Sequence, residues 1–180
     1  MVVPPGRRAV VVGCGLGDDA AELARRGYDV VAFDVAPSAV DWARNRFPRA
    51  GVDWRVADLL DLPDDLVGAF DLVVDVRTVQ SLPGVVRDAA MHAIGRLAAS
   101  GGAVLAVTLV AAATEVARTW QGPPWAQAPS ELAAYRAAGL ERVALEHPDA
   151  DDRGVMEVRL TLQRPAGNAS PGGGLPIVPA

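Results

Sequence analysis

A glycine-rich turn between two apolar runs is the feature that most constrains the fold of this chain. Residues 10–20 run Val-Val-Val-Gly-Cys-Gly-Leu-Gly-Asp-Asp-Ala and lead into a helical pattern, and the next apolar run ends at Asp34. A strand, a glycine turn, a helix, a second strand and a terminal acid form a nucleotide-binding βαβ unit. Glycines let the backbone bend sharply and approach a ligand, and Asp34 stands where a carboxylate accepts hydrogen bonds from both ribose hydroxyls. The sequence therefore predicts a nucleoside-bearing cofactor.

Length and composition narrow the class of protein. A chain of 180 residues with 51% hydrophobic content predicts one domain with a sizeable core. The formal net charge is −5 and the chain has no Lys/Arg run, which argues against nucleic acid as a partner. Cys14 is the single cysteine, so no disulfide within the chain is expected. With no leader-like segment and no apolar span of membrane length, the sequence predicts a cytoplasmic protein without membrane contact.

Short apolar runs alternate with amphipathic segments from residue 9 to about 140. This alternation predicts an α/β fold in which helices cover both faces of a doubly wound, mostly parallel sheet. The expected parallel strands are Ala9–Val12, Asp29–Asp34, Asp53–Val56, Phe70–Asp75 and Gly102–Thr108. The expected helices are Asp18–Arg26, Pro37–Phe47, Gly84–Ala99 and Pro129–Ala138.

Two further strand-like runs close the predicted domain. Leu140–His147 and Val155–Arg164 are joined by a short connection, which predicts an antiparallel hairpin and a mixed sheet of seven strands. The domain is expected to span residues 1–165. Residues 166–180 are mostly Gly, Pro, Ala, Ser and Asn, so we expect a disordered tail that cannot offset its own ordering entropy.

The spacing of the glycines discriminates between nucleotide cofactors. The dinucleotide fingerprint is G-x-G-x-x-G, whereas this turn is G-x-G-x-G and Asp18 occupies the position of the third glycine. An acid in the first turn of the helix repels a pyrophosphate, which disfavours NAD or FAD and an oxidoreductase function. A cofactor with a ribose, an adenine and a zwitterionic amino-acid tail fits better, because its ammonium group tolerates nearby carboxylates.

Four motifs then follow in order: Val-Val-Gly-Cys-Gly-Leu-Gly at 11–17, Asp34, Ala-Asp-Leu at 57–59 and Phe-Asp-Leu-Val-Val-Asp at 70–75. In this order and spacing they resemble the class I S-adenosylmethionine-dependent methyltransferases, and the resemblance covers residues 8 to about 165. It implies a Rossmann-like sheet with strand order 3-2-1-4-5-7-6, S-adenosylmethionine as the cofactor and methyl transfer to a small-molecule nucleophile.

The resemblance also implies roles for individual residues. The backbone of Gly13 to Gly17 is expected beneath the methionine part of the cofactor, Asp34 at the ribose hydroxyls and Asp58 at the adenine amino group. Asp75 and Val76 are expected to face the methyl donor and the acceptor. The full set of expected cofactor contacts is Gly13, Cys14, Gly15, Leu16, Gly17, Asp34, Val35, Ala57, Asp58, Leu59, Asp75 and Val76.

Residues 71–83 and the later Gly-Pro-Pro-Trp at 122–125 are similar to the thiopurine and tellurite-resistance methyltransferases. This narrower similarity implies a thiol, a chalcogen oxyanion or a halide as the acceptor. Arg77, Gln80 and Trp125 are the candidates for acceptor contact. The catalytic base stays unassigned, with Asp75 as a candidate base and Gln80 as a group that orients the acceptor.

Two departures from the family pattern support an alternative. Val11 occupies the position of an acid that usually anchors the methionine end, and about eight residues precede the first strand where relatives usually have capping helices. The alternative is a degenerate S-adenosylmethionine-binding or interaction domain without turnover. The missing cap further suggests that a second protomer of a homodimer, or an upstream segment, covers the cofactor crevice. His92 and His147 lack spaced partners, so no metal site is expected.

Overall fold

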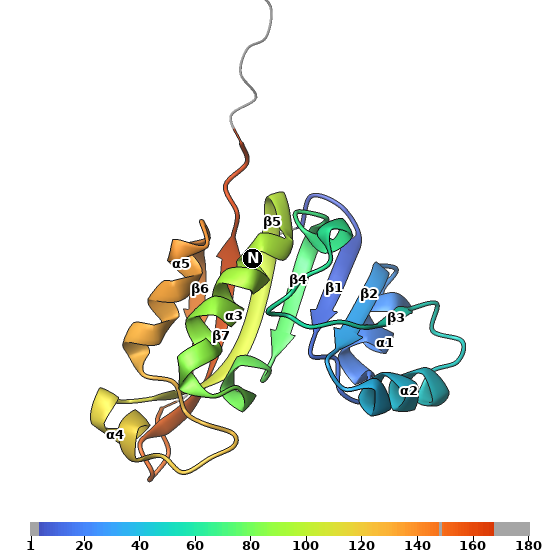
Figure 1. Cartoon of the computed structure of the whole chain (residues 1–180). Helices are drawn as coiled ribbons and strands as arrows, with labels where there is room; N and C mark the ends of the chain where they lie inside the picture. The colour runs from blue at the N-terminus through green and yellow to red at the C-terminus, as the bar shows by residue number, and fades with distance from the viewer. Residues whose placement is uncertain (1–3, 148, 168–180) are drawn as a thin grey trace, which may run out of the picture.

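The computed structural model describes residues 4–147 and 149–167 and shows one seven-stranded mixed sheet (Figure 1). The strand order is β3-β2-β1-β4-β5-β7-β6, as predicted. The first five strands are parallel, and β7 runs antiparallel to both β5 and β6. The strands are β1 (Arg8–Val12), β2 (Asp29–Asp34), β3 (Asp53–Val56), β4 (Phe70–Val76), β5 (Ala98–Ala111), β6 (Glu141–Glu146) and β7 (Val155–Gln163). Nearly all of the predicted tail lies outside the described residues.

In the described part of the chain, five helices and three 3₁₀ turns connect the strands. The helices are α1 (Asp18–Arg25), α2 (Pro37–Arg46), α3 (Gly84–Leu97), α4 (Thr114–Thr119) and α5 (Ala134–Ala137), and the 3₁₀ turns are η1 (Asp64–Leu66), η2 (Val79–Ser81) and η3 (Pro129–Ala133). Helix α2 begins at Pro37, where the missing N–H of proline leaves no helical bond unmade. The predicted helix at 129–138 is divided into η3 and α5, and the short α4 was not predicted.

Strand β5 is longer than the predicted range of 102–108 at both ends, because it starts at Ala98 directly after α3 and continues to Ala111. The predicted helix therefore ends at Leu97 and not at Ala99. Phe70 of β4 pairs with Ala98, but Leu72 pairs with Ala103, so the ladder is irregular between them. Gly101 in this segment has a φ of 77°, which glycine adopts without steric cost. Because of this irregularity, the first residues of β5 do not show the regular alternation of apolar and polar residues by which a strand is predicted.

Two apolar layers enclose the sheet around β1. On one face Val10, Val12 and Val73 pack with Ile94 of α3 and Tyr135 of α5. On the other face Val11, Val30 and Ala32 form a second cluster with Ala20 of α1. In Figure 1, α3 crosses in front of the sheet while α1 lies behind it. The two layers hold the carboxyl ends of β1, β2 and β4 in fixed positions.

The half of the sheet formed by β5, β7 and β6 is buried on one face and open on the other. Val104 and Leu160 are buried on the α3 face, whereas Leu105 is 37% exposed and Arg159 is exposed on the opposite face. The predicted helices on both faces are confirmed by α3 and α1. On β5 and β7 the face away from α3 carries exposed side chains, and α4 packs through Val116 against Ala111 and Val155 at one end of these strands. Among the described residues, none of the helices has the length and apolarity that crossing a bilayer requires.

Candidate functional site

A cleft of about 480 Å³ lies at the carboxyl ends of β1, β2 and β4. This is the edge at which open α/β sheets bind ligands, and the volume falls within the range of about 300–1,000 Å³ typical of small-molecule sites. The residues that line the cleft are Val12, Gly13, Phe33, Asp34, Val35, Ala57, Asp58, Leu59, Leu60, Val76, Arg77, Thr78, Ser81 and Leu82. Seven of the expected cofactor contacts are among them, together with Arg77.

The turn after β1 is built from three glycines with positive φ. The φ angles of Gly13, Gly15 and Gly17 are 57°, 50° and 88°. A Cβ on Gly13 would lie 2.6 Å from the Thr78 side chain, and one on Gly17 would lie 2.7 Å from the Trp54 ring. A Cβ on Gly15 would meet nothing within 4 Å. Gly13 and Gly17 are therefore needed for close packing as well as for backbone conformation, whereas Gly15 is needed for conformation alone.

Asp34 ends β2 and holds the glycine turn in place. Its Oδ2 accepts the backbone N–H of Gly15 at 3.0 Å, and its Oδ1 accepts the backbone N–H of Ala36 at 3.0 Å. A carboxylate offers about four acceptor lone pairs, two on each oxygen. One lone pair on each oxygen of Asp34 is left for a ligand. That arrangement matches a pair of neighbouring hydroxyl groups.

The segment after β3 forms the opposite wall of the cleft. Oδ1 of Asp58 accepts the backbone N–H of Leu60 at 2.8 Å, which closes a tight turn. Leu59 is buried in the core, whereas Val35 and Leu60 are 67% and 46% exposed. Exposed apolar side chains beside a carboxylate provide a surface for a flat ring that has a polar edge.

Residues directly after β4 form the floor and contribute a side chain that the sequence did not indicate. Thr78 lines the cleft, and its Oγ1 donates to the carbonyl of Val12 at 2.9 Å. Arg77 has a φ of 64°, a strained left-handed conformation for a residue that is not glycine. The only sequence signal for Thr78 is its place just beyond a buried strand.

Asp75 is placed differently from what we expected. Its side chain is fully buried, and it accepts the Tyr135 hydroxyl at 3.1 Å and the Thr78 N–H at 3.2 Å. Burial raises the pKa of Asp75 to about 6. The expectation that Asp75 faces the methyl donor is therefore corrected: it does not line the cleft, but supports Thr78 from the core side.

Gln80 and Trp125 also lie away from the cleft. Gln80 is 3% exposed, and its Oε1 accepts the backbone N–H of Leu109 at 2.7 Å. The backbone N–H of Trp125 donates to the Gln80 carbonyl at 2.7 Å. These bonds join η2 to β5 and to the loop after α4. Of the three candidates for acceptor contact, Arg77 alone lines the cleft.

Cys14 of the glycine turn and Asp18, the first residue of α1, do not line the cleft. Cys14 is buried, and burial together with the Asp34 charge raises the pKa of its thiol to about 11, so it is a packing residue. Asp18 accepts two hydrogen bonds from the Arg46 guanidinium, at 2.8 and 3.0 Å, which lower its pKa. Within the described part of the chain, no three His, Cys, Asp or Glu side chains are grouped to hold a metal ion.

Comparisons with known proteins match this architecture. Residues 9–102 match the family described as a methyltransferase domain. The magnesium-protoporphyrin O-methyltransferase of Rhodobacter capsulatus is 44% identical over 72 residues, which cover 38% of this chain and 31% of that protein. The ubiquinone biosynthesis O-methyltransferase of Xanthomonas axonopodis pv. citri (strain 306) is 35% identical over 108 residues, which cover 59% of this chain and 44% of that protein. The chain thus spans less than half the length of these curated relatives.

A solved structure shares the fold. The N-methyltransferase NodS from Bradyrhizobium japonicum WM9, in complex with S-adenosyl-l-homocysteine, superimposes with a TM-score of 0.70 at 20% sequence identity. The match covers 88% of this chain and 78% of NodS. Similarity at this level of identity shows a common fold.

Proposed function

Because the chain belongs to the methyltransferase-domain family, we propose that it binds S-adenosylmethionine in the cleft between β1, β2 and β4 and transfers the methyl group to a small molecule. The two curated relatives are named as O-methyltransferases, and NodS as an N-methyltransferase. These names favour an oxygen or nitrogen acceptor. The thiol, chalcogen or halide acceptor that the thiopurine-like pattern suggests is the second candidate, and an acceptor screen separates the two.

The geometry of Asp34 is the observation on which the cofactor proposal rests. Its two carboxylate oxygens keep one free lone pair each after accepting the N–H groups of Gly15 and Ala36. The two hydroxyls of a ribose would use both. Asp58 and the exposed Leu60 lie on the opposite wall, where an adenine would find an apolar surface and an acceptor for its amino group.

The remaining parts of the cleft also fit this cofactor. No atom lies within 4 Å of where a Cβ of Gly15 would be, so the turn leaves open space above its backbone. Val11 is 2% exposed and belongs to the core cluster beneath α1. Val11 therefore does not contact the methionine end of the cofactor. The groups of the glycine turn available to that end are its polar main-chain atoms.

Methyl transfer from a sulfonium is an in-line displacement in which the donor is already activated. The protein then contributes orientation and exclusion of water. The ionisable side chains that line the cleft are Asp34, Asp58 and Arg77, and Asp34 already accepts two N–H groups. Without a dedicated base in the cleft, the arrangement favours an acceptor that loses its proton easily, such as a phenol, over an aliphatic alcohol.

Isothermal titration with S-adenosylmethionine and S-adenosylhomocysteine tests the cofactor site. We expect micromolar binding that weakens about tenfold or more in Asp34→Asn, because the amide has one acceptor oxygen and no charge. Asp41→Asn on the exposed surface of α2 is the matched control and should bind as the wild type does. No heat and no thermal shift from a folded sample would reject the proposal.

The second candidate function is a domain that binds the cofactor without turnover. The buried Val11 in place of an acid favours it. Binding of S-adenosylmethionine without methyl transfer to any oxygen, nitrogen or sulfur acceptor in a screen would support this candidate over the enzyme.

A further inference from the structure

Arg77 is the one cationic side chain among the residues that line the candidate cofactor cleft. The two anions of the cleft, Asp34 and Asp58, are assigned to the ribose and the adenine by the proposed function. S-adenosylmethionine also carries a carboxylate at its methionine end, and a bound carboxylate needs hydrogen-bond donors or a cation beside it. The groups that could provide them are the N–H groups of the glycine turn, the start of α1 and the guanidinium of Arg77.

The N–H groups of the glycine turn are largely committed to acceptors within the protein. The N–H of Cys14 donates to the Phe33 carbonyl at 2.9 Å. The N–H of Gly15 donates to Oδ2 of Asp34 at 3.0 Å, and that of Gly17 donates to the Cys14 carbonyl at 2.9 Å. The main chain of the turn therefore has few N–H groups to give to a carboxylate.

The start of α1 does not suit an anion either. The helix begins with Asp18 and Asp19, and acids in a first turn oppose the binding of an anion at that end. Arg46 pairs with Asp18 but not with Asp19. Desolvation raises the pKa of Asp19, and the charge of Arg77 opposes this rise. The Arg77 guanidinium thus lies within electrostatic reach of this helix end, where it offsets the acid.

The backbone of Arg77 is fixed beside the glycine turn. Thr78 follows it and packs so closely against the turn that a Cβ on Gly13 would lie 2.6 Å from the Thr78 side chain. The N–H of Arg77 donates to the Val107 carbonyl at 2.8 Å, and its carbonyl accepts the Ser81 hydroxyl at 3.0 Å. These contacts hold a residue that is not glycine at a φ of 64°, and backbone strain of this kind clusters at functional sites.

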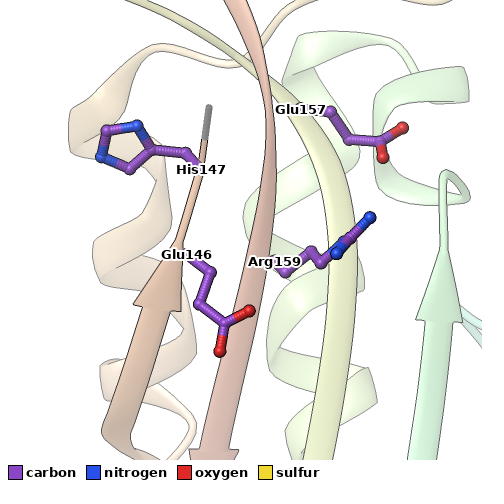
Figure 2. A pocket seen from close by; sticks show the side chains of 4 residues that line it. All are labelled: Glu146, His147, Glu157 and Arg159. Carbon is purple, nitrogen blue, oxygen red and sulfur yellow. The ribbon is translucent and has the colours of Figure 1, made fainter. Parts of the chain in front are cut away.

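A glutamate of β7 sets the direction of the Arg77 guanidinium. Figure 2 shows the Glu157 carboxylate extending across β5 toward β4. Its Oε2 accepts Nε of Arg77 at 3.2 Å and Nη2 at 2.5 Å, so the Nε–Nη2 edge of the guanidinium is occupied. Within residues 4–147 and 149–167, Arg77 has no second ion-pair partner. The Nη1–Nη2 edge, a planar fork that matches the two oxygens of a carboxylate, is left for a ligand.

We propose that Arg77 binds the carboxylate at the methionine end of S-adenosylmethionine. Strands β2 and β4 both flank β1, so Asp34 and Arg77 lie on opposite sides of the glycine turn. The ribose is held on one side and the carboxylate on the other, and the methionine chain passes through the open space above Gly15. The proposal rests on the proposed function, and it assigns Arg77 to the cofactor where the resemblance suggested the acceptor.

Two ligands that differ by one carboxylate test this assignment. S-adenosylhomocysteine has the carboxylate, whereas decarboxylated S-adenosylhomocysteine lacks it and keeps the adenosine, the sulfur and the ammonium group. Isothermal titration measures the dissociation constant of each. The wild type is expected to bind S-adenosylhomocysteine about five- to tenfold tighter than the decarboxylated ligand, the effect of one charge-assisted contact at a partly exposed site.

Variants of Arg77 show whether this preference comes from its charge. Arg77→Gln should bind S-adenosylhomocysteine as weakly as the wild type binds the decarboxylated ligand, with the affinity for the decarboxylated ligand unchanged. Arg77→Lys should restore part of the preference, because lysine keeps the charge but not the planar fork. Arg118→Gln is the matched control, since Arg118 is an exposed arginine that pairs with Glu115 and does not line the cleft.

The outcomes separate this assignment from the proposed function. If the wild type binds both ligands equally, if Arg77→Gln keeps the full preference, or if it weakens both ligands alike, the assignment of Arg77 is overturned while binding of S-adenosylhomocysteine still supports the cofactor site. If the wild type binds neither ligand, the proposed function fails, and the assignment of Arg77 fails with it.

Discussion

Replacing Asp75 by asparagine tests whether a buried carboxyl group makes this protein less stable as the pH rises. The pKa of Asp75 is raised by burial from 3.8 to about 6. The folded protein therefore holds this proton more tightly than the unfolded chain does. Its contribution to stability is fully present below pH 3.8 and is lost as the pH rises through about 6. A pKa difference of this size corresponds to about 3 kcal/mol.

The assay is urea unfolding of the wild type and of Asp75→Asn at pH 5 and at pH 8. From pKa values of 3.8 and about 6, the free energy of unfolding of the wild type should fall by about 1.5 kcal/mol more than that of the variant between these two pH values. Asparagine keeps an oxygen that accepts the Tyr135 hydroxyl but does not titrate. A parallel pH dependence of the two proteins, within about 0.5 kcal/mol, would refute the reasoning.

Tyr135→Phe provides an independent check on the same pair. It removes the hydroxyl that donates to Asp75 at 3.1 Å and so leaves a buried carboxylate oxygen without this donor. The loss should be about 1–3 kcal/mol at pH 8, where Asp75 is ionised, and smaller at pH 5. An equal loss at both pH values would mean that the hydroxyl does not stabilise the charged form.

Three further predictions concern the turns around the cleft. Gly17→Ala should destabilise the protein more than Gly15→Ala in urea unfolding, because both have positive φ but only Gly17 is crowded by Trp54; equal losses would contradict this. Arg77→Gly should be about 1 kcal/mol more stable than Arg77→Gln, since both lose the Glu157 ion pair but glycine relieves the left-handed strain at a φ of 64°. With a thiol pKa of about 11, Cys14 should react slowly with iodoacetamide at pH 8 in the native protein and rapidly in urea; fast native labelling would be inconsistent with its burial.

Much of the site was predictable because its elements are local in sequence. The glycine turn, the acid at the end of the second strand and the segment at 57–59 are each recognised from a few neighbouring residues. Parallel strands bring their carboxyl ends to one edge of the sheet, so these segments meet without knowledge of any side-chain contact. The strand order, which the resemblance implied, is confirmed, and so is the terminal hairpin, which two strand-like runs with a short connection predicted.

By itself, then, the sequence pattern predicted the alternation of strands and helices and the backbone of the glycine turn, because periodicity and glycine chemistry act over short distances. The strand order and the place of Asp58 on the cleft wall came from the resemblance to the methyltransferases. Only the tertiary structure decided that Asp75 pairs with Tyr135 in the core, that Gln80 supports β5, and that Arg77 reaches Glu157, 80 residues away. These contacts depend on packing between distant segments. Whether a carboxylate faces a ligand or a buried hydroxyl is settled by the side chains that surround it, and those come from distant parts of the chain.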